Sequence, residues 1–125
     1  MISSAFSVSP RSVVLDSEAL SALARKAPGM AELLEAARRQ DQRVIAPTVV
    51  LAEVMTGTAR DAAVWNAVKR LPLIDLEPRM AARAGALRQS ATRRRKKRDL
   101  TVDAMVAAVA VECAPAVVVT ADPDD

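Results

Sequence analysis

The stretch Val13-Val14-Leu15-Asp16 decides the fold of this 125-residue chain, because three branched apolar residues run directly into an acid. An uninterrupted apolar run is typical of a strand that is buried on both faces, as in the middle of a parallel sheet. The acid then lies at the carboxyl edge of the sheet, which is where open α/β folds bind ligands. The question for the remaining sequence is whether other acids meet Asp16 there.

The rest of the chain alternates short apolar runs with helical patterns. We predict further strands at 43–46, 73–76 and 117–119, and helices at 17–24, 30–40, 47–56, 59–70, 78–87 and 102–113. Ser17 and Thr101 are the expected helix caps, and Pro47 suits the first position of its helix. Strands that alternate with helices predict a parallel sheet, and this length fits one α/β domain over residues 1–125.

Several classes of site are excluded by composition. The chain has no histidine, which excludes Ser-His-Asp and Cys-His catalysis as well as histidine-ligated zinc. Its single cysteine, Cys113, cannot form an internal disulfide, so we expect a cytoplasmic protein. No uncharged run approaches the roughly 20 residues of a membrane helix, so no membrane contact is expected. The polar chemistry that remains is carboxylate, hydroxyl, lysine and arginine.

Positive charge is concentrated in one block. The whole chain has a net charge of +3, yet residues 93–98 are all basic, so the remainder is net acidic. Such a run is usually a solvated segment, although it can also bind RNA phosphates. The candidate RNA-binding residues are Arg93, Arg94, Arg95, Lys96, Lys97 and Arg98.

Four acids stand out because each interrupts an apolar context. Asp16 and Asp122 end predicted buried strands, while Glu53 lies within an apolar helix and Asp103 begins another. The three aspartates also have structural explanations, as a helix cap, as a turn residue before Pro123 and as a partner of the helix dipole. Glu53 resists such explanations, because an unpaired buried carboxylate costs several kcal/mol and its helix offers no nearby base.

Together the four acids predict a metal site. Parallel strand ends and helix starts share one edge of the sheet, so the three aspartates should lie together there, with Glu53 leaning over them. Carboxylates packed in this way repel one another, and a divalent cation removes the conflict. An all-oxygen ligand set suits Mg²⁺ or Mn²⁺, and such ions support phosphoryl chemistry.

Four short segments, taken in order, resemble the PIN domain, in particular the VapC-type ribonuclease toxins of bacterial toxin–antitoxin modules. The segments are Val-Leu-Asp-Ser at 14–17, Leu-Ala-Glu-Val at 51–54, Val-Asp-Ala at 102–104 and Thr-Ala-Asp-Pro-Asp-Asp at 120–125. The resemblance implies a PIN-like three-layer α/β/α fold with a central parallel sheet of four or five strands. It also implies Mg²⁺- or Mn²⁺-dependent cleavage of RNA, a homodimer, and inhibition by a cognate antitoxin protein.

The resemblance assigns roles to individual residues. The catalytic and metal-binding acids it implies are Asp16, Glu53, Asp103 and Asp122. It adds Asp125 as a further metal-binding acid and Thr120 as a supporting hydroxyl, and Ser17 is a second supporting hydroxyl.

Two other functions stay open from the sequence alone. One is a non-catalytic RNA-binding module with the same fold. The other is a phosphoacceptor signalling domain, which normally has paired acids after its first strand, an acceptor aspartate after its third and a lysine after its last. Here Asp75 lies within its predicted strand, and no lysine follows Lys97. Independently of these functions, an apolar helix face at Met80, Ala84 and Leu87 suggests a dimer contact.

Overall fold

The computed structural model describes residues 11–92 and 100–121 of the chain. The elements are β1 (Ser12–Leu15), α1 (Ser17–Ala24), α2 (Met30–Arg39), β2 (Arg43–Pro47), α3 (Val50–Val54), α4 (Asp61–Val68), β3 (Leu73–Ile74), α5 (Pro78–Thr92), α6 (Thr101–Glu112) and β4 (Ala116–Val119). Strands and helices therefore alternate as the sequence predicts. Within the described residues, no helix is both long enough and apolar enough to cross a membrane.

The four strands form one parallel sheet in the order β3-β2-β1-β4. β1 lies in its interior, with Val13 opposite Val44 of β2 on one side and Val117 of β4 on the other. The side chains of Val14 and Leu15 are completely buried. The apolar run that precedes Asp16 is thus a central strand covered on both faces, as predicted.

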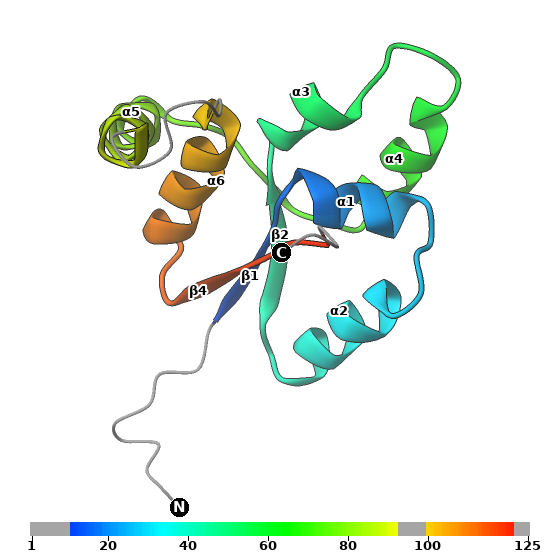
Figure 1. The fold of residues 1–125 in the computed structure, drawn as a ribbon. Coiled ribbons are helices and arrows are strands. Elements are labelled where there is room, and N and C mark those ends of the chain that lie inside the picture. Colours follow the sequence, from blue (N-terminus) through cyan, green and yellow to red (C-terminus); the bar gives the residue numbers. More distant parts are fainter. Residues whose placement is uncertain (1–10, 93–99, 122–125) are drawn as a thin grey trace, which may run out of the picture.

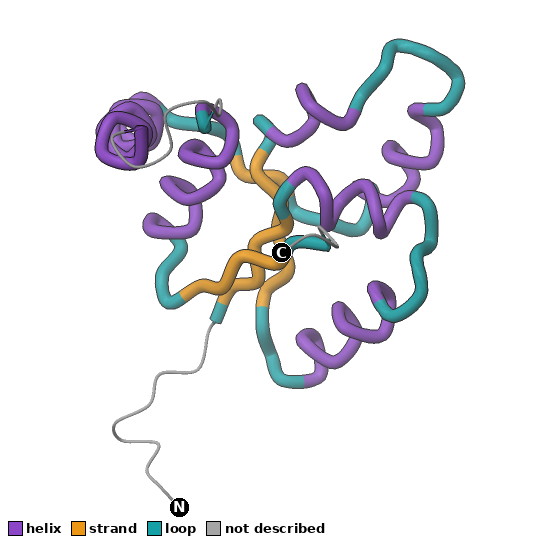
Figure 2. The backbone as a smooth tube through the Cα atoms, viewed as in Figure 1, coloured by secondary structure: helices purple, strands orange, loops and turns teal. Residues whose placement is uncertain are grey.

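Helices cover both faces of the sheet, which makes the three-layer α/β/α architecture that the sequence predicts (Figure 1). α1, α2 and α4 lie on one side of the strands, while α6 lies on the other with α5 packed against it. Figure 2 shows the strands as the central layer between these two groups of helices.

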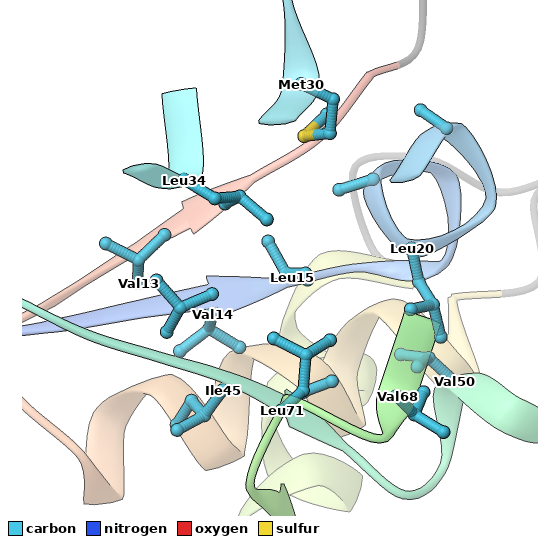
Figure 3. Packing of buried hydrophobic residues seen from close by; sticks show 14 of the residues in the cluster. Val13, Val14, Leu15, Leu20, Met30, Leu34, Ile45, Val50, Val68 and Leu71 are labelled. Atoms are coloured by element: carbon cyan, nitrogen blue, oxygen red, sulfur yellow. The ribbon is translucent and has the colours of Figure 1, made fainter. Parts of the chain in front are cut away.

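The main core lies between the sheet and the first group of helices. Leu15 of β1 faces Leu20 of α1 and Leu34 of α2, all of them almost fully buried (Figure 3). In α2 the buried residues follow a helical spacing of four and three, through Met30, Leu34 and Ala37, so one stripe of this helix packs on the sheet. Burial of each large aliphatic side chain contributes about 1.5–3 kcal/mol to folding.

A second cluster joins α5 to α6. Met80 and Ala84 of α5 pack against Ala104, Ala108 and Val109 of α6, where the alanines allow the helices to approach closely. The prediction of a dimer face is therefore wrong for Met80 and Ala84, because α6 already buries both side chains. Leu87 alone remains partly exposed, at 37%.

Both predicted helix caps are wrong by one residue. Asp16, not Ser17, caps α1, and its side chain accepts the backbone N–H of Ala19. α6 has Leu100 at its N-cap position without a side-chain bond, while the Thr101 hydroxyl accepts a hydrogen bond from Arg88 at 3.3 Å. Structural capping, one of the explanations considered for Asp16, is thus confirmed.

The predicted helix from 47 to 56 is helical over only half of its length. Pro47 ends β2. Its missing N–H costs no hydrogen bond to β1, because the pairing of β2 with β1 already stops at Ile45. α3 then covers only five residues, of which Val50 alone is buried, and Glu53 is exposed. The prediction of a buried helix around a buried Glu53 is therefore wrong.

β4 is also more exposed than predicted. It is the last strand in the sheet order, and Val117 and Val118 expose 42% and 40% of their surface. These two residues point to opposite faces, as successive residues of a strand do. β4 is therefore an edge strand that is partly open on both faces.

Candidate functional site

Asp16 lies at the carboxyl edge of the sheet, between the ends of β1 and β4. Its backbone N–H donates to the carbonyl of Val119 at 3.1 Å, one step beyond the Leu15–Val119 pair. Its Oδ1 accepts the N–H of Ala19 at 2.8 Å and so fixes the carboxylate in the first turn of α1. The strand and the cap together determine where this half-buried acid stands.

Glu53 reaches the same place from α3. The hydroxyl of Ser17, the residue directly after Asp16, donates to Oε1 of Glu53 across 36 positions of sequence. α3 also packs against α1, so this bond joins two helices that are in contact. Two acids that the sequence separates widely are therefore brought to the same turn of α1.

Each of these two acids has one carboxylate oxygen that accepts no hydrogen bond from the described residues. Among the described residues, the only hydrogen bond to the Asp16 carboxylate is at Oδ1, and the only one to Glu53 is at Oε1. Asp16 is half-buried and Glu53 is exposed, so water and ions can reach this edge of the sheet. The remaining oxygens are Oδ2 of Asp16 and Oε2 of Glu53.

Asp103 and Thr120 lie at the same edge of the fold. Asp103 is in the first turn of α6, a helix that leads back along the sheet into parallel β4, and its residue is exposed. Thr120 follows β4 directly, one residue beyond Val119, whose carbonyl accepts the Asp16 N–H. That these residues form one site with Asp16 stays a prediction.

The described residues do not, however, form a complete metal cluster. Nowhere in 11–92 and 100–121 do three or more acid or cysteine side chains gather closely enough to hold an ion. Asp122, Asp125 and the basic residues at 93–98 lie outside the described residues. Within 11–92 and 100–121 the structure thus joins Glu53 to the Asp16 turn, and Asp103 is not part of a group of three such side chains there.

One aspartate that the sequence analysis overlooked is the best-satisfied acid in the described chain. Asp61, at the start of α4, is only 9% exposed, and its two oxygens accept the N–H and hydroxyl of Thr56 and the N–H of Gly57, at 2.7–2.8 Å. The Thr56 N–H is the largest of several causes that lower the pKa of Asp61 below its usual 3.8. The signal in the sequence was the Thr-Gly-Thr turn just before it.

The chemistry of the site fits a hard divalent cation in part. Asp16 and Glu53 offer open carboxylate oxygens and the neighbouring Thr120 offers a hydroxyl, an all-oxygen set of the kind that Mg²⁺ and Mn²⁺ prefer. Such ions often keep several waters and use only a few carboxylates, so a partial protein shell is compatible with binding.

Comparisons with known proteins agree with the fold. No protein with a curated description matches this chain in sequence. A chain of VapBC2 from Rickettsia felis, solved bound to a DNA fragment from its promoter, is similar with a TM-score of 0.70 and 19% identity, over 87% of this chain and 86% of that one. Mycobacterium tuberculosis VapC20, described as a sarcin–ricin loop cleaving toxin, has a TM-score of 0.56 and 15% identity, over 80% and 82%.

The family assignment rests on sequence. Residues 13–124 match the PIN domain, a region that begins in β1 and includes Asp16, Glu53, Asp103 and Asp122. The match covers nearly the whole chain and every acid of the predicted site except the last. This chain belongs to the PIN domain family.

Proposed function

We propose that this protein is a Mg²⁺- or Mn²⁺-dependent endoribonuclease, the toxin component of a type II toxin–antitoxin system. The observation that carries the proposal is the pair of carboxylates Asp16, which caps α1, and Glu53 of α3, which binds Ser17 in the first turn of α1, at the carboxyl edge of a PIN-domain sheet. Open carboxylate oxygens in such a place suit a divalent cation. The cation can then bind a phosphate, whose negative charge the carboxylates alone would repel.

Each residue has a role in the proposal. Asp16 and Asp103 would hold the ion directly, and Glu53 and Asp122 would hold it directly or through water, with Asp125 as a further acid. A bound Mg²⁺ or Mn²⁺ supplies an activated water and neutralises charge on the phosphate. Thr120, the residue after the Val119 carbonyl that binds the Asp16 N–H, would be a supporting hydroxyl beside the ion.

The partners follow from family membership and from the similar folds. VapBC2 is by name a toxin–antitoxin complex, and VapC20 is named as a toxin that cleaves the sarcin–ricin loop. We propose RNA as the substrate here, a cognate antitoxin protein as the inhibitor, a homodimer as the working form, and the cytoplasm as its location. The basic residues at 93–98 would contact RNA phosphates.

A cleavage assay on total RNA tests the proposal. The purified protein should cut RNA with Mg²⁺ or Mn²⁺ and lose that activity in EDTA. Glu18→Gln is a matched control for site variants, because it removes an exposed charge from the same turn of α1 without touching the pair. Metal-independent cleavage, or no cleavage of any RNA, would contradict the proposal.

One observation favours the second candidate, a non-catalytic RNA-binding module. Within the described ranges no three acids lie close together. A fold that binds no ion would avoid such a group, because the carboxylates would repel one another. Binding assays separate the two functions: a binding module retains RNA without cutting it, whether or not metal is present. Neutralising residues 93–98 should lower RNA affinity and flatten its salt dependence in either case.

A further inference from the structure

We infer that Ser17 is a positioning residue for the metal site, because its hydroxyl holds Glu53 beside Asp16 before any ion binds. The inference rests on the proposed metal-dependent function and concerns the same edge of the sheet. Ser17 does not touch the ion in this account. It acts through Glu53, whose Oε1 accepts the Ser17 hydroxyl while Oε2 stays open.

The α1 turn that carries Ser17 is rigid. The Ala19 N–H binds the Asp16 side chain at 2.8 Å, and the Leu20 N–H binds the Asp16 carbonyl at 3.0 Å. Ala19 and Leu20 are both completely buried under this turn. The backbone of Ser17 is therefore fixed, and its short side chain carries the hydroxyl only one rotatable bond away. Such a hydroxyl can hold a more mobile group in place.

Glu53 stands on a much weaker element. α3 has five residues, and only Val50 among them is fully buried. The Glu53 residue is exposed, and the bond from Ser17 is the only hydrogen bond to its side chain among the described residues. Without that bond the long side chain would occupy several rotamers, and an ion would have to order it on binding.

The consequence is a carboxylate pair that is arranged in advance. Asp16 is held through Oδ1 by the Ala19 N–H and Glu53 through Oε1 by the Ser17 hydroxyl. Donors on the first turn of α1 thus fix one oxygen of each carboxylate, and the other accepts no bond from the described residues. Outer partners that orient metal ligands typically change metal affinity by about 10–100-fold when removed. Because the Ser17–Glu53 bond is exposed to water, we expect a loss near the lower end, about tenfold.

The experiment measures Mn²⁺ affinity directly, by electron paramagnetic resonance of free Mn²⁺ during titration of the full chain without RNA. Ser17→Ala should raise the Mn²⁺ Kd about tenfold, and Ser17→Thr, which keeps the hydroxyl, should restore it. Ser21→Ala is the matched control, since it removes a hydroxyl from the same helix that binds only Arg25 in the described chain. It should leave the Kd unchanged.

A double-mutant cycle shows whether Ser17 acts through Glu53. In a Glu53→Ala background, Ser17→Ala should have no further effect on the Mn²⁺ Kd, because the group that it positions is gone. An equal loss in both backgrounds would overturn the inference. So would an unchanged Kd in Ser17→Ala accompanied by a lower Tm, which is the signature of a bond that only docks α1 on α3.

Failure of the inference and failure of the proposed function are distinguishable. If the protein cleaves RNA with metal but Ser17→Ala binds Mn²⁺ as the unaltered chain does, only the positioning role is overturned. If no RNA is cleaved but the Ser17 effect and its dependence on Glu53 are seen, the positioning role stands and the nuclease assignment falls. If the unaltered chain binds no Mn²⁺, both are overturned.

Discussion

Asp16 and Asp61 both stand at the start of a helix, yet their oxygens are used differently. Asp16 gives one oxygen to the Ala19 N–H and keeps the other open, at an edge that solvent reaches. Asp61 is nearly buried, and both of its oxygens accept bonds from Thr56 and Gly57. One oxygen of Asp16 accepts no bond from the described residues, whereas both oxygens of Asp61 accept bonds.

Under the proposed function, the difference separates a metal-binding acid from a structural one. A carboxylate whose oxygens are all bound to backbone and hydroxyl donors has no capacity left for an ion, and its bonds hold the loop that donates them. A carboxylate that spends one oxygen on a cap is fixed in position and still able to bind a cation. Substitution of each aspartate by asparagine should therefore affect different properties.

The largest effect is expected on catalysis from Asp16→Asn. Asparagine caps helices about as well as aspartate and can keep the bond to Ala19, so the fold should persist. The lost charge should reduce RNA cleavage by more than about 100-fold, beyond what removal of an outer partner causes. Cleavage rates and circular dichroism check this, with Glu18→Gln as the control. Full activity in Asp16→Asn would remove Asp16 from the site.

The second effect is stabilisation by metal. At a Mn²⁺ concentration a hundredfold above the Kd, the free energy of unfolding should rise by about 2.7 kcal/mol, which is several degrees in Tm for a domain of this size. Asp16→Asn should shrink the shift, whereas Asp61→Asn should keep it, because Asp61 has no open oxygen. Thermal melts with and without Mn²⁺ measure it. Equal shifts in both variants would end the distinction between the two acids.

The third effect is on stability from Asp61→Asn. The new amide group would place a donor against the donors of Thr56 or Gly57, so the metal-free Tm should fall by several degrees. Asp75→Asn, at an exposed aspartate, is the control and should change the Tm little. An unchanged Tm in Asp61→Asn would show that the three bonds do not hold this loop.

The contribution of Asp61 should also depend on pH. Its pKa is lower in the folded protein than the usual 3.8, so the unfolded chain binds more protons as the pH falls. The stability from this group is therefore complete above the unfolded pKa and is lost as the pH falls through the folded value. Urea unfolding should show a gap between the unaltered chain and Asp61→Asn that is constant at neutral pH and narrows below about pH 4.

The smallest effect is expected from Thr56→Val. It removes the hydroxyl that donates to Asp61 and that also bonds the hydroxyl and N–H of Thr58, and it leaves the N–H groups of Thr56 and Gly57 in place on Asp61. The Tm should fall by less than in Asp61→Asn, and Thr56→Ser should restore it. A larger fall than that of Asp61→Asn would mean that Thr56 stabilises the loop by other contacts.

The same pair of aspartates shows what sequence reasoning can reach. The run Val13–Leu15 predicted the central strand, because burial on both faces leaves a plain apolar signature, and Asp16 followed from the direction of that strand. The order of helices and strands, and the position of Asp103 in a first turn, followed from periodicity in the same way. These features depend on local pattern alone.

The errors have non-local causes. α3 ends at Val54 because the next amides, those of Thr56 and Gly57, bind Asp61 instead of continuing the helix. The apolar neighbours of Glu53 predict that it is buried, whereas only Val50 of that short helix reaches the core. The exposure of β4 depends on its place at the edge of the sheet, which no periodicity reports.

The pairing of β1 with β4 has a consequence for how the protein is made. The two strands are about a hundred residues apart in the chain, and such non-local pairs form late in folding. During synthesis β1 must wait, with one edge open, until β4 has left the ribosome. Thr120, which β4 carries to the side of Asp16, arrives only then. If the proposed site is correct, a nascent chain has no assembled site, and its own synthesis delays any activity until β4 is in place.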